Sequence, residues 1–312
     1  MLKNAFILSV VALALSAVNL QDANADIFRT IEDLEQAEVF AQSSIFDGVG
    51  LLVGTNGSGE NFVAGTAFLL EDGDGIDGSR WLGTAGHTLF SAPETPWERL
   101  RFFNQPDVLG GDLNAFFEVD LTVPFPGFTG SEANGGVGND IGLARLTESI
   151  VGVNAIDRFF GPESDLIGAE FITAGYGQPG VFGSPLGDFD GIRRGGRNVI
   201  DSSGAAFGVT TIENQFFVSD FDRFDSDNPL PGEWQSSNGA SGSPWLVDIN
   251  GNLVLAGITN GSLDNDLFSF GISTPRFNDF ISTTIEPVPE PGTMALLTLA
   301  LFGGAMRRRR KA

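Results

Sequence analysis

Short apolar stretches, each followed by a turn, recur along most of this chain and restrict its fold more than any other feature. The stretches are rich in aromatic and β-branched residues and too short for typical helices, so they favour strands. Glycine, aspartate and proline are frequent in the segments between them, as is typical of turns. The predicted strands are 62–70, 81–84, 116–123, 141–146, 171–177, 199–200, 216–218, 253–259 and 268–272. We therefore predict an all-β fold.

Three short patterns carry residues that suit nucleophilic catalysis. The single histidine, His87, ends the run WLGTAGH, Asp140 lies in NDIGLARL, and Ser241 lies in NGASGSP. A serine hydroxyl needs a base to take its proton and N–H donors to stabilise the oxyanion that forms. Glycines on both sides of Ser241 let the backbone turn sharply, so that N–H groups can converge there. Each pattern alone also fits an ordinary turn, cap or strand end.

Taken together and in the order His, Asp, Ser, these patterns resemble the chymotrypsin-type serine proteases. The resemblance covers most of residues 46–282. It implies two consecutive antiparallel β-barrels with the active site between them, and a short C-terminal helix that begins near Thr274. It also implies that Ser241 is the nucleophile, His87 the general base and Asp140 the residue that orients the imidazole. The backbone N–H groups of Gly239 and Ser241 would form the oxyanion hole.

Two positions near Ser241 depart from the trypsin-like pattern. Ala240 stands where animal enzymes of this family have an aspartate that binds the newly cut N-terminus on activation. Alanine cannot form that ion pair, so we expect an oxyanion hole that needs no such switch, while control by an N-terminal segment stays open. Ser243 replaces the usual glycine and makes this ending similar to that of the bacterial glutamyl endopeptidases. Its small hydroxyl is not expected to block the site.

The resemblance also assigns candidate substrate-binding residues. Gln235 stands six positions before Ser241, where a trypsin has the carboxylate that binds Arg or Lys. The glutamyl enzymes use a pocket histidine, and this chain has no second histidine. We therefore expect a polar, uncharged pocket, with Thr259, Asn260 and Gly261 forming the edge that pairs with substrate backbone.

Metal binding is a separate question. Asp72, Asp74 and Asp77 alternate with glycines in one loop, and closely spaced oxygen ligands of this kind suit calcium. The alternative is an ordinary solvated turn in a very acidic protein, because the complete EF-hand spacing is absent. No cofactor is required by the predicted chemistry, and calcium would act as a structural ion.

The N-terminal end has the features of a secretory signal. Lys3 is followed by an apolar run over 5–15, and Ala23-Asn24-Ala25 matches an A-x-A cleavage site. The run is short for a membrane span, so we expect residues 1–25 to be removed as a signal peptide.

The C-terminal end carries a second targeting pattern. Val288-Pro289-Glu290-Pro291 precedes an apolar stretch over 292–306 and a basic cluster over 307–311. The basic cluster would remain cytoplasmic and hold the apolar stretch in the inner membrane. This arrangement resembles the PEP-CTERM sorting signal, which an exosortase-type membrane enzyme recognises and cuts. It implies export through the inner membrane, transient anchoring, and a final place at the cell surface or outside the cell.

Charge limits the candidate partners. Residues 26–288 contain 11 arginines, no lysine and 38 acidic residues, and the chain has no cysteine. Such a surface repels nucleic acid and anionic membranes, and no disulfide holds the fold. The expected partners are therefore a protein or peptide substrate and the processing enzyme, with an extracellular polysaccharide matrix as a further candidate.

We therefore expect a signal peptide at 1–25, a lead segment at 26–45, a first barrel at 46–160, a second at 161–285, and a sorting signal at 286–312. The expected function is that of a secreted serine endopeptidase working through an acyl-enzyme. Two alternatives remain open: a catalytically inactive matrix or adhesion protein with a protease fold, and an esterase that uses the same triad.

Overall fold

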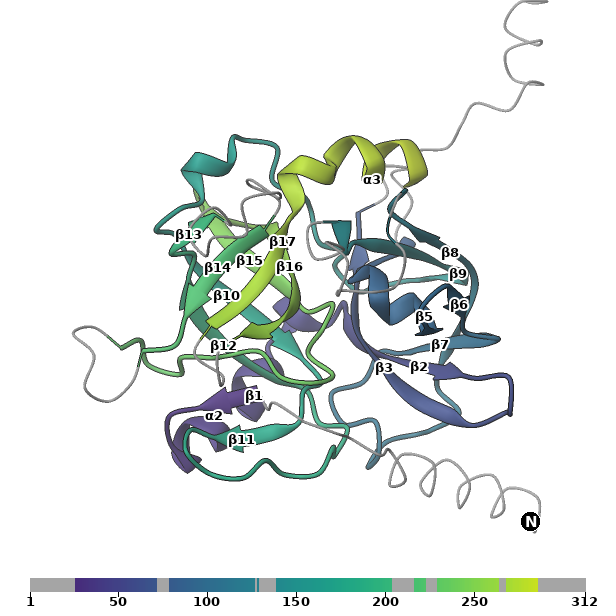
Figure 1. Ribbon diagram of the computed structural model, residues 1–312, viewed down its shortest axis with the longest axis horizontal. Helices are drawn as coiled ribbons and strands as arrows, with labels where there is room; N and C mark the ends of the chain where they lie inside the picture. The colour runs from purple at the N-terminus through teal and green to yellow at the C-terminus, as the bar shows by residue number, and fades with distance from the viewer. Residues whose placement is uncertain are drawn as a thin grey trace, which may run out of the picture.

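Two β-structures form the body of the protein in the computed structural model (Figure 1). The structure describes residues 26–71, 79–126, 128, 139–203, 216–222, 229–263 and 268–285. The signal and sorting segments predicted at the two ends lie outside these ranges. Within them, no helix is both long enough and apolar enough to cross a membrane.

The first β-structure is a closed barrel of six antiparallel strands in the order β2-β3-β4-β9-β8-β7. Its strands are β2 (Val49–Thr55), β3 (Asn61–Leu70), β4 (Ser79–Thr84), β7 (Arg99–Phe103), β8 (Phe117–Pro124) and β9 (Gly142–Ile150). A short hairpin of β5 (Phe90–Ala92) and β6 (Thr95–Pro96) follows the 3-10 turn η2 (Gly86–Leu89). This turn carries His87 out of the barrel wall.

The second β-structure is a seven-stranded antiparallel sheet in the order β12-β10-β15-β16-β17-β14-β13, which forms a half-barrel. Its strands are β10 (Glu170–Gly175), β12 (Arg194–Val199), β13 (Ser202–Ser203), β14 (Phe216–Asp220), β15 (Pro244–Ile249), β16 (Asn252–Leu263) and β17 (Phe268–Ser273). The predicted all-β class is thus confirmed. The first predicted barrel is closed, and the second half is an open sheet over the residues that the structure describes.

The N-terminal part of the described chain forms short elements outside the two β-structures. Strand β1 (Asp26–Phe28) pairs in parallel with β11 (Pro179–Val181), and helix α2 (Ile31–Ala41) follows it. Thr30 caps this helix by accepting a hydrogen bond from the Asp33 N–H at 3.0 Å. Two further 3-10 turns, Ser44–Phe46 and Glu163–Asp165, join the larger elements.

The predicted C-terminal helix is confirmed. A 3-10 turn over Thr274–Phe277 leads into α3 (Asn278–Ile285), which lies over the top of the molecule in Figure 1. Phe277 and Ile281 are buried, and Phe280 is half-buried. Phe277 meets Phe125 of the first half edge-on, with ring centroids 4.9 Å apart. The helix therefore joins both halves, which also share one apolar core that includes Phe68.

Candidate active site

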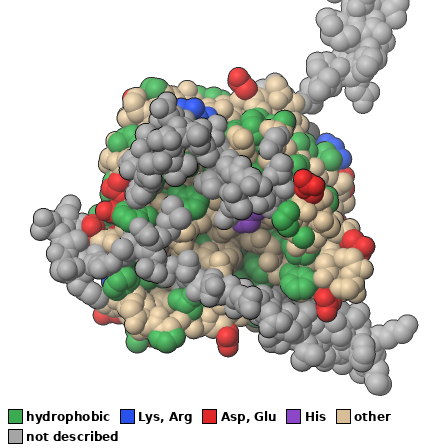
Figure 2. Space-filling view, viewed as in Figure 1, with side chains coloured by type: hydrophobic (Ala, Val, Ile, Leu, Met, Phe, Trp, Pro, Cys, Tyr) green, Lys and Arg blue, Asp and Glu red, His purple; other side chains and the backbone are tan. Residues whose placement is uncertain are grey.

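His87 and Asp140 are brought together by the pairing of two neighbouring barrel strands. Thr84 at the end of β4 lies opposite Gly142 at the start of β9, so the residues just beyond these positions meet. His87 Nδ1 lies 2.6 Å from Asp140 Oδ2, and the His87 backbone N–H donates to Asp140 Oδ1 at 2.6 Å. Asp140 is fully buried, whereas the His87 side chain keeps a quarter of its surface exposed. The carboxylate thus orients the imidazole, and part of the ring stays accessible. The face of the molecule shown in Figure 2 is hollowed near its centre.

Asn260 is a second partner of Asp140. Its side-chain N–H donates to Asp140 Oδ2, the oxygen that also contacts the His87 ring. The sequence assigns Asn260 to the edge of a substrate pocket, which stays a prediction, and the structure adds a contact of its side-chain amide with Asp140. The sequence pattern gave no sign of this contact, which joins residues 120 positions apart.

Ser241 lies in a tight loop whose backbone conformation requires glycine at two positions. Gly239 and Gly242 have φ values of +94° and +92°, in the left-handed region that other residues rarely adopt. A Cβ on Gly242 would lie 2.0 Å from the Thr66 carbonyl oxygen, so the loop also presses closely on the first barrel. The Ser241 hydroxyl donates to the carbonyl oxygen of Asn260 at 3.1 Å. The two glycines therefore let the chain present Ser241 at the boundary between the halves.

Thr66 of β3 fixes this loop from the first barrel. Its backbone N–H donates to the Ser241 carbonyl at 2.8 Å, and its hydroxyl donates to the Gly239 carbonyl at 3.0 Å. The same hydroxyl accepts the Tyr176 N–H at 3.0 Å. The sequence places Thr66 only within the predicted strand 62–70. Its role depends on contacts across the two halves, for which no local pattern exists.

The peptide between Asn238 and Gly239 has a fixed orientation. The Asn238 carbonyl accepts the Gln178 N–H at 3.1 Å. Because a trans peptide is planar, the Gly239 N–H points away from that carbonyl and cannot turn over without breaking this bond.

The peptide between Ala240 and Ser241 is held in the same way. Its carbonyl accepts both the Ser243 N–H at 2.9 Å and the Ser243 hydroxyl at 2.6 Å. Ser243 therefore braces the loop, while Ala240 is buried in an apolar cluster. Within the part of the chain that the structure describes, neither the Gly239 nor the Ser241 N–H donates a hydrogen bond. Two oriented donors are thus left for a ligand oxyanion.

Among the predicted pocket residues, Gln235, Thr259 and Asn260 are buried and Gly261 is half-buried. Ser236 donates to the Gly261 carbonyl at 2.8 Å, and the Thr259 hydroxyl accepts the Trp245 indole N–H at 2.9 Å. The Gln235 amide nitrogen and oxygen are buried and have no hydrogen-bond partner among the residues that the structure describes. The Thr259 N–H and carbonyl bind Ser243 and Gly242, so they support the loop. The pocket assignment stays a prediction.

The calcium prediction concerns Asp72, Asp74 and Asp77, which lie outside the described residues. Among the residues that are described, no group of three or more His, Asp or Glu side chains could hold a metal ion.

The C-terminal segment, which the structure does not describe, is the part of the chain that a family comparison recognises. Residues 287–311 match the PEP-CTERM protein-sorting motif. This motif indicates export and sorting to the cell surface by an exosortase, so the predicted localisation and processing partner are confirmed. No curated protein matches the chain. The barrel and half-barrel are compatible with the chymotrypsin-type fold that the sequence resembles.

The site therefore combines four elements of acyl-transfer chemistry. A hydroxyl lies at a braced turn, where it donates to the Asn260 carbonyl, an imidazole is oriented by a buried carboxylate, that carboxylate has an amide partner, and two backbone N–H groups donate to no other described residue. Acyl transfer uses a nucleophile, a base and oxyanion donors of these kinds.

Proposed function

We propose that this PEP-CTERM protein is a serine endopeptidase that acts outside the inner membrane. The observation that carries the proposal is the Asp140 carboxylate, buried between the His87 ring and the Asn260 amide. A buried carboxylate on Nδ1 holds the imidazole in the tautomer whose Nε2 can accept a proton. The preformed loop at Ser241 supports the same conclusion.

In the proposed reaction, Ser241 Oγ attacks the carbonyl carbon of a peptide bond and His87 takes its proton. The oxyanion accepts hydrogen bonds from the Gly239 and Ser241 N–H groups, and Asp140 stabilises the imidazolium. His87 then donates the proton to the leaving amine, which gives an acyl-enzyme. Water hydrolyses this ester by the reverse proton path and regenerates Ser241.

The substrate side chain before the cleaved bond is proposed to be neutral. Gln235 brings no charge to the predicted pocket, and its buried amide has an unpaired donor and an unpaired acceptor. A lone basic or acidic side chain would meet no opposite charge on this residue. Calcium is proposed only as a structural ion.

Labelling of the exported protein with a fluorophosphonate probe tests the proposal. The wild type should be labelled, with and without calcium, and Ser241→Ala and His87→Ala should lose the label. Cleavage of an unfolded protein substrate should fall at least about a thousandfold in both variants. Ser58→Ala, which changes an exposed serine in the turn after β2, is the matched control and should react like the wild type.

The two alternatives give different results in the same experiment. Labelling together with hydrolysis of esters but not of any unfolded protein would identify an esterase. Folded wild-type protein that is not labelled in either condition would refute the proposal and favour an inactive protease-fold scaffold.

A further inference from the structure

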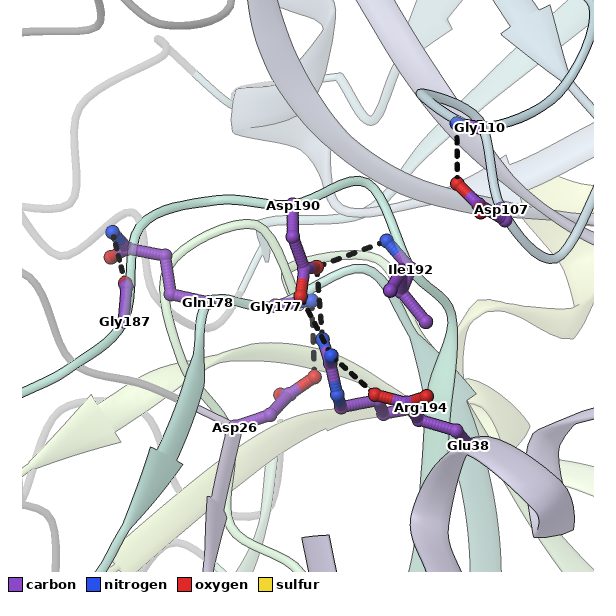
Figure 3. A network of polar contacts seen from close by, with 10 residues as sticks. All are labelled: Asp26, Glu38, Asp107, Gly110, Gly177, Gln178, Gly187, Asp190, Ile192 and Arg194. Carbon is purple, nitrogen blue, oxygen red and sulfur yellow. Dashed lines mark hydrogen bonds and ion pairs between the residues drawn. The ribbon is translucent and has the colours of Figure 1, made fainter. Parts of the chain in front are cut away.

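Asp26 lies fully buried at the start of the described chain, beside the loop that carries Ser241. Its carboxylate accepts three hydrogen bonds from two separate segments. Oδ2 accepts the Gly177 N–H at 3.0 Å, and Oδ1 accepts the Ser237 hydroxyl at 3.1 Å and the Trp234 indole N–H at 3.2 Å. Figure 3 shows the Asp26 side chain pointing toward Gly177.

These two segments also meet each other at the candidate oxyanion hole. Gly177 is followed by Gln178, whose N–H holds the Asn238 carbonyl, and Asn238 follows Ser237. The hydrogen bond between Gln178 and Asn238 orients the Gly239 N–H. The Asp26 carboxylate binds Gly177 and Ser237, the residues that directly precede these two. The Asp26 N–H closes the arrangement by donating to the Gln178 carbonyl at 2.5 Å. One residue therefore clamps both sides of this bond.

These groups approach so closely that a side chain at position 177 would not fit between them. A Cβ on Gly177 would lie 2.3 Å from Asp26 Cγ and 2.0 Å from the Ser237 hydroxyl oxygen. Only glycine at position 177 lets the carboxylate reach the backbone N–H.

Burial of this carboxyl group is unfavourable for its charged form and raises its pKa to about 7. The charged group that opposes this shift is Arg194 of β12. Arg194 is itself paired with Glu38 of α2 at 2.6 Å and with Asp190 at 2.7 Å (Figure 3). Burial disfavours the charged form of the Asp26 carboxyl group. The three hydrogen-bond donors and Arg194, whose charge is partly neutralised by Glu38 and Asp190, stabilise this charged form.

We propose that Asp26 is a positioning residue that sets the Gly239 N–H for the oxyanion, an inference that rests on the proposed function. Asp26 belongs to the N-terminal segment of the described chain, whereas Ala240, the residue before the proposed nucleophile, has no carboxylate.

Asp26→Asn tests the proposal in the exported protein, because it preserves the shape of the side chain. The amide puts an N–H where Oδ1 or Oδ2 accepts a donor, so at least one clamp is lost. We expect kcat on a peptide substrate to fall about tenfold to a hundredfold, with KM changed less than about twofold. Asp248→Asn is the control: Asp248 accepts the Gly251 N–H in a hairpin turn outside the site, so kcat should be unchanged.

Hydrogen exchange gives a readout that does not depend on activity. In Asp26→Asn, backbone amides of 176–178 and 237–241 should exchange faster, while those of β15 and β16 keep their wild-type rates. Folded wild-type protein that does not react with the fluorophosphonate probe would refute the protease function. The hydrogen-exchange result would still decide whether Asp26 holds the two segments. Unchanged exchange at both segments, or a kcat equal to that of the wild type, would overturn the positioning role.

Ser237→Ala serves as a second variant should Asp26→Asn fail to fold. It removes one donor to the carboxylate and leaves the charge and the Gly177 contact in place. We expect a severalfold loss in kcat and faster exchange confined to the same two segments. Wild-type values of both would refute the proposal.

Discussion

Asp140 is a buried carboxylate, and each of its two oxygens has hydrogen-bond partners. The His87 backbone N–H binds one oxygen, while the His87 ring and the Asn260 amide share the other. A carboxylate held by several donors keeps one orientation. Asn260 therefore belongs, with Asp140, to the residues that orient the His87 ring.

Asn260→Ala should lower kcat about tenfold and leave KM within about twofold, because the variant loses a donor to Asp140 but no substrate contact. Asn260→Asp should be worse, since a second carboxylate would face the first. Steady-state kinetics on a peptide substrate measures both effects. A rise in KM with unchanged kcat would instead support the original expectation that Asn260 binds substrate.

His87, Asp140 and Ser241 could be singled out as candidates from sequence because each lies in a short local pattern, and the structure brings His87 and Asp140 into contact. The contacts of Thr66, Asn260 and Asp26 could not be predicted in this way. They join residues 173, 120 and 211 positions apart, and no spacing rule covers such distances. Local patterns thus indicate the candidate reacting groups, and only the fold reveals the residues that hold them.

At the scale of elements, Arg193 joins several segments through one buried side chain. Its guanidinium donates to the carbonyl oxygens of Ala41, Phe46 and Val49 at distances between 2.7 and 3.1 Å. These carbonyls lie at the end of α2, in the following 3-10 turn and at the start of β2. One side chain thus fixes the path of the chain between the N-terminal helix and the first barrel.

Arg193→Ala should destabilise the protein by about 3–5 kcal/mol, because three buried carbonyl groups lose their donors. Arg193→Lys should lose less, since an ammonium group keeps the charge but cannot span all three. Arg276→Ala, which removes a partly exposed ion pair with Glu163, should cost only about 0–1 kcal/mol. Urea unfolding of the three variants provides the comparison, and equal losses for Arg193→Ala and Arg276→Ala would contradict the prediction.

Most strands could be predicted from their composition, but several elements could not. Strand β12 contains two glycines and two arginines in six residues, so its sequence lacks an apolar pattern. Helix α2 lies in the stretch predicted only as a lead segment, and Ile31 and Val39, which are 67% and 70% exposed, blur its apolar face. Both elements depend on tertiary contacts, α2 against β12 and β12 against β10.

At the scale of the whole molecule, two buried carboxyl groups make the free energy of unfolding depend on pH. Burial raises the pKa of Asp26 to about 7 and that of Glu233 to about 7, well above the ordinary values of 3.8 and 4.5. The folded state therefore binds protons between pH 4 and 7 that the unfolded state has released. By linkage, stability is highest below the unfolded pKa values and falls as pH rises through 7.

The Tm should accordingly be higher near pH 5 than near pH 8, when measured by thermal unfolding at fixed ionic strength. The net negative charge of the body increases in the same direction and adds self-repulsion at the higher pH. Asp26→Asn combined with Glu233→Gln should flatten this dependence, because neither amide titrates. A wild-type Tm that rises from pH 5 to pH 8 would contradict the assignment of these two groups.

The hydrogen bonds of Asp26 reach Gly177 and Ser237, 151 and 211 positions further along the chain. A polypeptide that crosses the inner membrane from its N-terminal end delivers Asp26 long before either partner. Contacts of such high sequence separation close large loops and form late in folding. The Asp26 contacts that hold the Gly239 N–H are therefore assembled only after nearly the whole body has been translocated. For the proposed protease, this order places completion of the proposed oxyanion site outside the inner membrane, away from the proteins of the cell interior.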